Sequence, residues 1–397
     1  MGKSLKIDNE NLEKTRLHFR ENMPVTKKWA YFDHAAVAPL PASSRQAILH
    51  WLDQATEEGD TCWPHWNRQL EKLRRCGADL LHASQDEIAL IPNTSSGISF
   101  VAEGLPWKAG DNLVIPNNEF PSNALPWKHL EDRGVEVRQV PIVDASGDFD
   151  LSPMARAIDG RTRLISASWI GFSNGLRIPL DDVCELATSK KVLFFLDAIQ
   201  GLGVFPLDLS KYPIDFVAAD GHKWMLGPEG AGMLFVRQKL LDQIRPSVVG
   251  WGSVEESWKF SPDCWSWKKN ASKFEAGSAN MVGMIGFQAS LEFLLSLGCH
   301  QPDNPVEKLI LDNVAQFEQA LRSLGARFKL ASKSSMRSGI VSFEFPGADP
   351  DSVRKQLMDA GIVTSVRQGK LRISTHAYNN EDDFGRLIDT LKDSIHV

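Results

Sequence analysis

The 397-residue sequence predicts an α/β protein with a large domain built on a mostly parallel β-sheet and a small α+β domain at the C-terminus. Short, continuous apolar runs occupy residues 112–116, 163–168, 192–196 and 231–236, and they are too short to be buried helices. Helical patterns alternate with these runs, and the pattern changes after Asn280. Continuous apolar strands separated by helices indicate βαβ units, whose parallel sheet is covered on both faces.

Three regions are expected along the chain. Residues 1–30 are polar and charged, and they predict an N-terminal arm with a short helix that packs with the small domain. Residues 31–285 form the predicted large domain, in which a helix begins near Ser152 as N-cap and Pro153 as the first helical residue. Residues 286–397 form the predicted small domain.

The C-terminal part has an order of elements different from that of the large domain. A long apolar helix over residues 281–297 leads to a loop at 298–305 that contains two prolines. A helix, a strand at 340–345, another helix, a strand at 370–374 and a final helix follow. These elements predict a compact α+β unit of about 100 residues, which is a common size for a domain.

Composition excludes several classes of protein. Hydrophobic residues make up 43% and charged residues 24%, as in ordinary globular proteins, and acidic residues exceed basic ones by six. We therefore expect no nucleic-acid partner, because a basic excess or stripe is lacking. No apolar run is long enough to span a membrane and no secretory signal is recognisable, so a cytoplasmic location is expected. The five scattered cysteines and ten histidines form no CxxC or HExxH pattern, so no metal is predicted.

A turn rich in hydroxyl residues follows the predicted strand at 86–91. It reads Pro-Asn-Thr-Ser-Ser-Gly and a helix begins directly after it, with Thr94 and Ser95 at its start. Free backbone N–H groups and the helix dipole make such a helix N-terminus a cradle for a phosphate. The same residues also suit simple capping of the helix, and this segment alone does not separate the two interpretations.

A carboxylate and a lysine follow two later strands. Asp197 comes directly after the apolar run 192–196, and Lys223 follows the predicted strand at 215–219 in a glycine-rich surround. The two residues are 26 positions apart, about one strand-helix-strand unit, so both are expected at the same edge of the sheet. Ligands of open α/β sheets bind at that edge, beyond the carboxyl ends of the strands.

An anion cradle, a carboxylate and a lysine together are the set that pyridoxal 5'-phosphate (PLP) requires. The phosphate is held at a helix N-terminus, the aldehyde condenses with a lysine amine, and a carboxylate keeps the pyridine nitrogen protonated. Other cofactor or hydrolase signatures are lacking, because the glycines from Gly201 to Pro206 do not complete G-x-G-x-x-G and no G-x-S-x-G is present.

Three motifs resemble one known family. Asp197-Ala-Ile-Gln200, Asp220-Gly-His222-Lys223 and the segment from Phe274 to Asn280 are similar to those of class V aminotransferases, a group of fold-type I PLP-dependent enzymes. The resemblance begins near Tyr31 and extends to the C-terminal helix. The group includes cysteine desulfurases, selenocysteine lyases, kynureninases and isopenicillin N epimerase-like proteins, so it implies PLP as cofactor and an amino acid as substrate.

The resemblance also implies roles for individual residues. For the cofactor they are Thr94 and Ser95 at the phosphate, Phe120 on the pyridine face, Asp197 at the ring nitrogen, Gln200 at the ring hydroxyl, His222 near the phosphate and Lys223 as the Schiff-base lysine. Ser278 would reach the phosphate of a neighbouring subunit, which implies a homodimer. Arg372 would clamp the substrate α-carboxylate, with His34 and Ala35 as further substrate contacts, although a surface arginine at a strand end is the alternative for Arg372.

Departures from the family pattern bear on the reaction. Desulfurases and selenocysteine lyases carry a nucleophilic cysteine on a mobile loop shortly before the substrate arginine, whereas residues 362–372 are short and contain no cysteine. Asp220 stands where desulfurases have a phosphate-binding serine. These features favour an aminotransferase or an epimerase- or racemase-like enzyme. A PLP-dependent C–S or other β-lyase, or a non-catalytic protein with this fold, are the alternatives.

Overall fold

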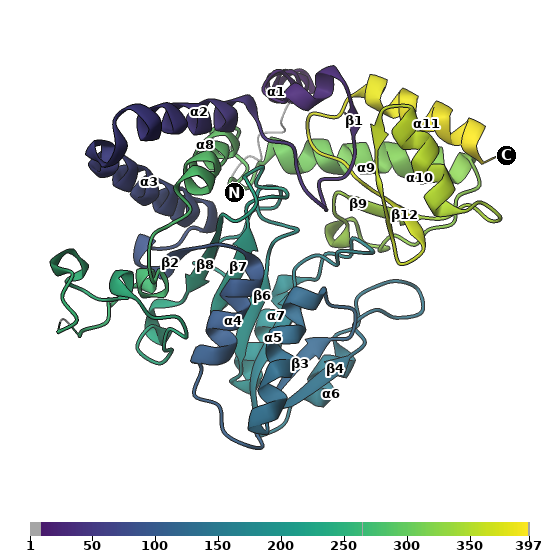
Figure 1. The fold of residues 1–397 in the computed structure, drawn as a ribbon. Coiled ribbons are helices and arrows are strands. Elements are labelled where there is room, and N and C mark those ends of the chain that lie inside the picture. The colour runs from purple at the N-terminus through teal and green to yellow at the C-terminus, as the bar shows by residue number, and fades with distance from the viewer. Residues whose placement is uncertain (1–8, 264, 396–397) are drawn as a thin grey trace, which may run out of the picture.

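The computed structural model describes residues 9–263 and 265–395, and its centre is a seven-stranded sheet (Figure 1). The strand order is β2-β8-β7-β6-β5-β3-β4. The strands are β2 (Ile88–Ile91), β3 (Asn112–Pro116), β4 (Glu136–Val140), β5 (Thr162–Ser168), β6 (Leu193–Asp197), β7 (Phe216–Asp220) and β8 (Gly232–Val236). Only β8 runs against the others, because it is antiparallel to both β7 and β2. The carboxyl ends of β2, β5, β6 and β7 therefore meet at one edge of the sheet.

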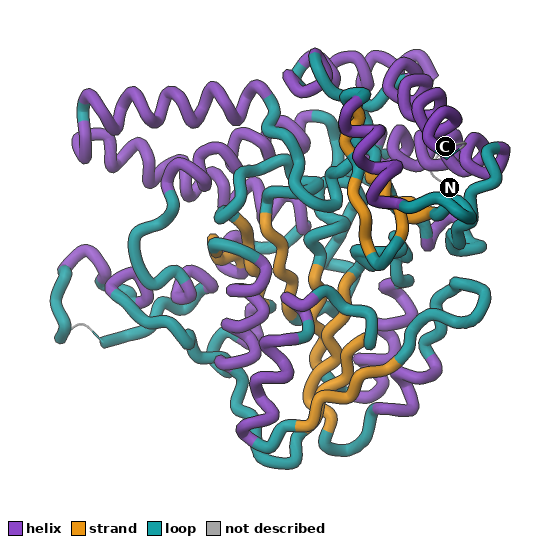
Figure 2. Tube along the Cα trace, turned by 45° about the vertical axis from the view of Figure 1, so that its right-hand side comes forward, coloured by secondary structure: helices purple, strands orange, loops and turns teal. Residues whose placement is uncertain are grey.

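Both faces of the sheet are buried, as the continuous apolar strands predict. Neighbouring residues of one strand belong to different hydrophobic clusters: Val114 and Phe194 pack on one face, and Ile115 and Phe195 pack on the other. Figure 2 shows helices on the two sides of the strands. Fold-type I topology, with a mostly parallel sheet between helices, is confirmed by the solved structures described below.

Helix α4 (Thr94–Gly104) packs unusually close to the sheet. A Cβ atom at Gly97 would lie 2.8 Å from Cδ1 of Ile91 and 2.9 Å from Cβ of Ala218. Only a residue without a side chain allows this approach. The N-terminus of α4 is thereby held against the ends of β2 and β7.

Helices surround the sheet and form a separate layer at one end of it. The helices of the large domain are α2 (Ala42–Glu57), α3 (Trp63–Leu81), α4, α5 (Leu125–Lys128), α6 (Ser152–Ala157) and α7 (Leu180–Lys190). Helix α8 (Met281–Ser296) packs against α2 and α3. The predicted domain boundary between residues 285 and 286 thus lies inside α8.

The C-terminal part forms its own α+β unit. An antiparallel sheet with the order β11-β12-β9 contains β9 (Ile340–Phe343), β11 (Ser365–Arg367) and β12 (Lys370–Ser374). Three helices complete it, namely α9 (Pro305–Ser323), α10 (Pro350–Asp359) and α11 (Glu381–Ser394). A two-stranded parallel sheet of β1 (Ala30–Tyr31) and β10 (Ile362–Val363) links it to the start of the large domain. A hydrophobic cluster containing Phe32, Phe317 and Ile373 lies within this unit.

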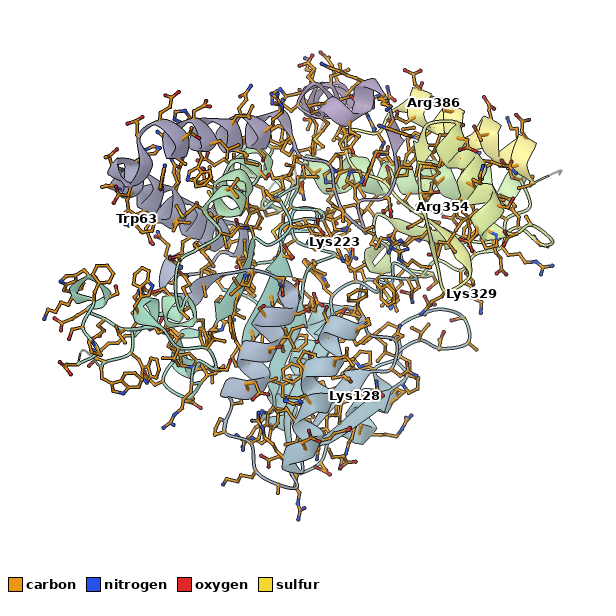
Figure 3. All side chains as sticks on the ribbon, in the orientation of Figure 1. Trp63, Lys128, Lys223, Lys329, Arg354 and Arg386 are labelled. Atoms are coloured by element: carbon orange, nitrogen blue, oxygen red, sulfur yellow. The ribbon has the colours of Figure 1, made fainter. Side chains whose placement is uncertain are left out.

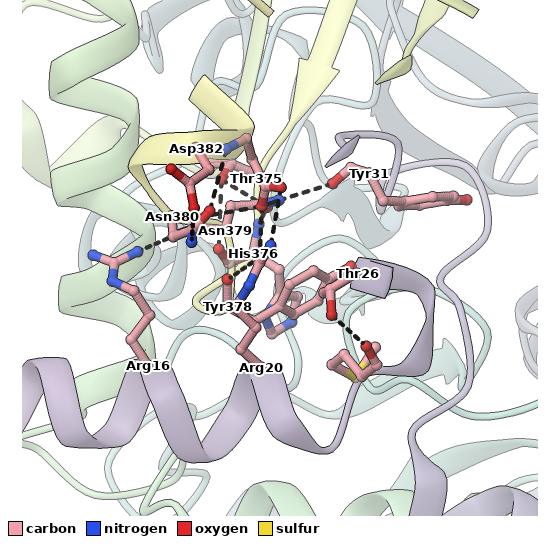
Figure 4. Close-up of polar contacts among 12 residues, drawn as sticks. Arg16, Arg20, Thr26, Tyr31, Thr375, His376, Tyr378, Asn379, Asn380 and Asp382 are labelled. Atoms are coloured by element: carbon pink, nitrogen blue, oxygen red, sulfur yellow. Dashed lines mark hydrogen bonds and ion pairs between the residues drawn. The ribbon is translucent and has the colours of Figure 1, made fainter. Parts of the chain in front are cut away.

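Helix α1 (Asn9–Glu21) packs against the C-terminal unit. Arg16 donates a hydrogen bond to Asn313 at 3.0 Å, and Arg20 pairs with Asp383 at 2.7 Å. Figure 4 shows Arg16 and Arg20 pointing from α1 toward the segment with Tyr378 and Asn379. The N-terminal arm predicted from residues 1–30 therefore includes a helix of 13 residues, and residues 1–8 lie outside the described part.

Element ends differ from the sequence-based prediction by one or two residues. The strand expected at 86–91 begins at Ile88, because Ser84 caps a short 3-10 turn before it. Asp197 and Asp220 are the last residues of β6 and β7 rather than the first residues of turns. Leu151 and not Ser152 occupies the N-cap position of helix α6, and it forms no capping hydrogen bond through its side chain. Within residues 9–263 and 265–395, no helix is long and apolar enough to cross a membrane.

Candidate active site

Lys223 is a buried amine in the turn after β7. Only 8% of its surface is exposed, and Figure 3 shows it between the main sheet and the C-terminal unit. Its Nζ lies 5.5 Å from the ring centroid of Phe120 and forms no ion pair within 4.0 Å among the described residues. Burial lowers the pKa of Lys223 to about 8, and the charge of Asp197 opposes this lowering. A buried lysine with a depressed pKa and no ion-pair partner is typical of a functional site.

Asp197 ends the neighbouring strand and is also buried. One carboxylate oxygen accepts a hydrogen bond from the backbone N–H of Ile199 at 3.1 Å. Burial raises the pKa of Asp197 to about 6, while this hydrogen bond and the charge of Lys223 lower it. Because β6 and β7 are parallel neighbours, the two groups are brought to the same edge of the sheet, as the 26-residue spacing predicts.

The turn after β2 holds Thr94 and Ser95 at the N-terminus of α4. The cap itself is Asn93, whose side chain accepts a hydrogen bond from the N–H of Ser96 at 2.9 Å. Thr94 Oγ1 accepts a bond from the backbone N–H of Asp220 at 2.9 Å, and Ser95 Oγ donates to Ser122 at 2.7 Å. Thr94 and Ser95 are therefore not needed to cap the helix, which favours the anion-cradle interpretation of this turn.

Asp220 and His222 form a pair beside this cradle. Nδ1 of His222 lies 3.0 Å from Oδ2 of Asp220, although the two atoms do not form a well-aligned hydrogen bond and Nδ1 has no other hydrogen-bond partner among the described residues. The other oxygen, Oδ1, is buried without a hydrogen-bond partner among the described residues. Asp220 is thus a close neighbour of the His222 imidazole, which is a placement that the sequence alone does not reveal.

Gln200 is buried behind Asp197 and bonded at both ends of its amide. Its Oε1 accepts a hydrogen bond from Nε1 of Trp224 at 2.7 Å, and its Nε2 donates to the carbonyl of Ala35 at 3.0 Å. One N–H of the amide remains for a ligand. Gln200 thus joins the Lys223 turn to the segment that follows β1.

Arg372 on β12 is almost wholly buried, with 1% of its surface exposed. Its guanidinium donates to Ser365 Oγ at 3.1 Å and to the carbonyl of Phe172 at 2.8 Å, and it pairs with Asp33 at 3.1 Å. Burial lowers the pKa of Arg372, and the charge of Asp33 opposes this. The alternative of a surface arginine is wrong. Three of the five N–H donors are engaged, which leaves two for a carboxylate.

His34 and Ala35, which the resemblance implies as substrate contacts, form hydrogen bonds within the chain. His34 is fully buried, with Nδ1 at 3.0 Å from the carbonyl of Ser374 and Nε2 at 2.7 Å from the hydroxyl of Tyr378. No ring nitrogen is left for a ligand. The backbone N–H of Ala35 donates to Ser374 Oγ at 2.8 Å, and its carbonyl accepts from Gln200. All of these polar groups are therefore bonded within the chain, and they connect the segment after β1 to Ser374, Tyr378 and Gln200.

Glu119 is a further ionisable group of the site that the sequence-based prediction does not include. Its Oε1 accepts a bond from the N–H of Ser168 at 2.7 Å, and Oε2 accepts from the Ser168 hydroxyl. Burial raises the pKa of Glu119 to about 7, and the charge of nearby Asp197 adds to this rise. Its position in the turn after β3 is the only sequence signal that could have pointed to it.

The remaining predicted residues lie at the surface of the chain. Phe120 is 41% exposed and packs edge-on against Phe172 at 5.2 Å, so its free face can meet a ring. Ser278 is exposed in the segment before α8 and makes no contact with Lys223 or Asp197 among the described interactions. Ser278 is therefore free to contact another molecule.

Cysteines do not contribute to this site among the described residues. Cys62, Cys76, Cys184 and Cys299 are buried, and Cys264 lies outside the described part. Burial raises the pKa of Cys76 to about 11 and those of Cys184 and Cys299 to about 12. Such thiols are poor nucleophiles, because the thiolate is the reactive form.

The residues present fit PLP. A buried amine without an ion-pair partner faces an aromatic ring, a buried carboxylate lies on the next strand, and the N-terminus of α4 presents Thr94 beside Asp220. Lys223 would hold the aldehyde carbon, Asp197 the ring nitrogen, and the α4 end the phosphate. This combination of fold and site defines a PLP-dependent enzyme of fold type I.

Comparison with known proteins identifies the family. The model of the aminotransferase class-V family matches residues 30–387, and the chain belongs to this family. A probable cysteine desulfurase of Methanothermobacter thermautotrophicus is 29% identical over 395 residues, covering 94% of this chain and 96% of the relative.

Solved structures agree on the fold. A mutant of C-DES with glycine covalently linked to its PLP cofactor has a TM-score of 0.87 at 22% identity, covering 94% of this chain and 99% of that one. A complex of C-DES, described as a cystine C–S lyase, with its product cysteine persulfide has a TM-score of 0.86 at 22% identity and the same coverage. PLP is the cofactor of this family, as the motifs predict.

Proposed function

We propose that this protein is a PLP-dependent β-lyase that cleaves the bond between Cβ and a sulfur substituent of an amino acid and releases the sulfur product to solvent. The observation that carries the proposal is the two-residue turn between β11 and β12. Arg367 pairs with Lys370 across it, so Gln368 and Gly369 are its only residues. No loop is available here for a cysteine that would receive the sulfur.

The relatives and the buried thiols support the same reaction. The named relatives are cysteine desulfurases and a cystine C–S lyase, so their names describe sulfur amino acids as substrates. The four described cysteines are buried, and the pKa values of Cys76, Cys184 and Cys299 are raised to 11 or 12. Amino transfer and epimerisation, which the motifs favour, would use the same lysine and carboxylate. The reaction products distinguish amino transfer and epimerisation from the β-lyase reaction.

Each residue of the site has a defined task in this proposal. PLP, when bound, supplies an electron sink that stabilises negative charge at Cα of the substrate. Lys223 would act as the base once the substrate amine has replaced it on the cofactor and released its Nζ, and a pKa of about 8 for the free amine leaves a neutral fraction near pH 7 to accept the proton from Cα. The electron pair left at Cα forms the double bond to Cβ, and the sulfur leaves with the pair of the Cβ–S bond. Water then hydrolyses the released 2-aminoacrylate to pyruvate and ammonia. Asp197 supports the charge at the ring nitrogen from its buried position.

Arg372 would hold the substrate α-carboxylate through its two unused N–H donors. A guanidinium presents a planar fork that matches a carboxylate, and charge-assisted bonds contribute about 1.5–3 kcal/mol each. Comparing KM for an amino acid and for its decarboxylated amine tests this role. Arg372→Ala should abolish the preference for the carboxylate, whereas Arg367→Ala should reduce it less. A full preference in Arg372→Ala would show that the carboxylate is bound elsewhere.

The reaction is tested by product analysis with cystine, cysteine and S-methylcysteine. A β-lyase forms pyruvate and ammonia, a desulfurase forms alanine, an aminotransferase forms a 2-oxo acid that keeps sulfur, and an epimerase forms the D-amino acid. We expect pyruvate and ammonia in equal amounts, and none with Lys223→Ala. Alanine together with a persulfide on any cysteine, including Cys264, would overturn the proposal.

The exposed segment around Ser278 supports a homodimer as part of this proposal. Ser278 makes no contact with the described site of its own chain, and the family resemblance implies that it reaches a neighbouring subunit. We expect sedimentation at twice the chain mass. Ser278→Ala should weaken retention of PLP without changing the mass, whereas a monomer that retains PLP fully would refute this part.

A further inference from the structure

A cavity lies between the large domain and the C-terminal unit, next to the candidate active site. It has a volume of about 670 Å³ and opens between the segments 143–147 and 173–176 of the large domain and the C-terminal unit. Six basic side chains line it, namely Arg322, Arg327, Lys329, Arg337, Arg367 and Lys370. Figure 3 shows Lys329 at the junction of the two parts, on the same side as the C-terminal unit.

Most of this positive charge is not neutralised within the chain. Arg322 and Arg337 both pair with Glu318, at 2.9 and 2.8 Å. The other four cations, Arg327, Lys329, Arg367 and Lys370, have no carboxylate within 4.0 Å among the described residues.

The acidic side chains of the cavity do not compensate these four cations. Only Asp144 and Glu344 line it, and Asp144 accepts hydrogen bonds from three backbone N–H groups of its own turn. Glu344 forms no ion pair among the described residues, although its backbone pairs with that of Arg327. The cavity is therefore strongly positive, although the whole chain carries a formal charge of −6.

One short loop borders both this cavity and the surroundings of Lys223. The ring of Phe172 packs on Phe120, which faces Lys223, and the carbonyl of Phe172 accepts a bond from Arg372. The next residue, Ser173, lines the cavity, and its carbonyl accepts a bond from Ser342. Phe172 therefore belongs to the surroundings of Lys223, and Ser173 belongs to the wall of the cavity.

Arg367 connects the cavity with the active site. It is half-buried, and among the described residues its guanidinium forms one hydrogen bond, from Nη1 to the carbonyl of Val366 at 2.8 Å, so most of its donors are available. Its charge lowers the pKa values of both Lys223 and Arg372, so it lies within electrostatic reach of both groups. An anion bound to Arg367 would therefore also lie near the substrate site.

We infer that this cavity binds the far end of the substrate side chain and selects amino acids that carry a second carboxylate there. The inference rests on the proposed function, since it names the substrate class of the same site. Arg372 would hold the α-carboxylate while Arg367, with Lys370 and Arg327 at the rim, holds the second one. A guanidinium is suited to this task because it offers paired donors to a planar oxyanion.

Two pairs of isosteric compounds test the inference on the PLP-loaded protein. S-carboxymethylcysteine and S-carbamoylmethylcysteine differ only in a carboxylate against an amide, and the ratio of their kcat/KM values measures the preference in turnover. 2-Aminoadipate and its side-chain amide have carbon in place of sulfur and no leaving group at Cβ, so calorimetry measures their binding alone.

We expect the acid of each pair to be favoured at least tenfold in the wild type. The preference should fall to threefold or less in Arg367→Gln and should be reduced in Lys370→Gln, an exposed position where folding is not at risk. Lys128→Gln, an exposed lysine of α5 outside the cavity, is the matched control and should keep the full preference.

The outcomes separate this inference from the proposed reaction. Equal binding of 2-aminoadipate and its amide, or a preference that persists in both Arg367→Gln and Lys370→Gln, would overturn the inference even if pyruvate is formed. A preference in binding that disappears in these variants supports the cavity even if the product is not pyruvate. In that case only the proposed lyase reaction fails.

Discussion

The pKa of Lys223 offers a direct test of the site, because it depends on opposing effects that a single substitution separates. The pKa is lowered to about 8 in the folded protein. Burial is the main cause of the lowering, the carboxylate of Asp197 opposes it, and the charge of Arg372 adds to it. In Asp197→Asn, Lys223 stays buried and Arg372 stays nearby, but the negative charge that raises the pKa of Lys223 is lost. An opposite charge at close range shifts a pKa by about 1 to 3 pH units, so we expect a fall from about 8 to about 7 or below.

The consequence is measurable on the apoprotein, without any turnover. At pH 7 about a tenth of the amines are neutral when the pKa is 8, and half are neutral when it is 7. The rate at which an amine reagent modifies Lys223, followed by peptide mass spectrometry from pH 5.5 to 9.5, gives the pKa. Exposed Lys128 in the same digest reports the intrinsic reactivity of the reagent.

A matched variant makes this test specific. Asp220 also raises the pKa of Lys223, but less than Asp197 does, so Asp220→Asn should produce a smaller fall. An unchanged or higher pKa in Asp197→Asn would refute the reasoning, since it would mean that Asp197 does not act on this amine. With PLP bound, Asp197→Asn should also lose turnover by several orders of magnitude, where each ~1.4 kcal/mol of barrier is a factor of ten.

Three further outcomes are expected. Gly97→Ala should destabilise the protein by about 1–3 kcal/mol in urea unfolding, because its Cβ would lie 2.8 Å from Ile91, whereas exposed Gly160→Ala should be neutral since nothing lies within 4 Å. The pKa of His34 is lowered to about 4 by burial, so the unfolded chain binds a proton that the folded chain does not, and stability should fall by about 3 kcal/mol as the pH drops from 6.5 to 4. His34→Gln should flatten this dependence, and an equal slope in the variant would contradict it. Replacing all five cysteines with alanine should leave pyruvate formation intact if the variant folds, and loss of turnover in a folded variant would point to a catalytic thiol.

The sequence predicts the core of the site well because parallel strands impose its geometry. Asp197 and Lys223 end neighbouring parallel strands, so strand order alone brings them together. The hydroxyl-rich turn at Thr94 joins them because β2 runs in the same direction as β7, although β8 lies between these two strands.

Contacts between distant segments could not be predicted in the same way. Asp33 and Arg372 are 339 positions apart, and no local pattern indicates that the arginine is already paired. His34 shows the same limit, because the family resemblance implies a substrate contact, whereas Ser374 and Tyr378 from the other end of the chain occupy both ring nitrogens. Such pairings depend on how the C-terminal unit docks, which composition and periodicity do not encode.

The turn between β11 and β12 also bears on how this family can change its chemistry. Gln368 and Gly369 both have positive φ angles, of 52° and 72°, as tight hairpin turns that match the twist of their strands require. Doubling the length of a flexible loop costs only about 0.6 kcal/mol of closure entropy. An insertion at these two residues would therefore leave the sheet intact, and it would place new side chains near Arg372. Under the reaction proposed above, this surface turn, and not the cofactor site, is where a cysteine that accepts sulfur would have to be added.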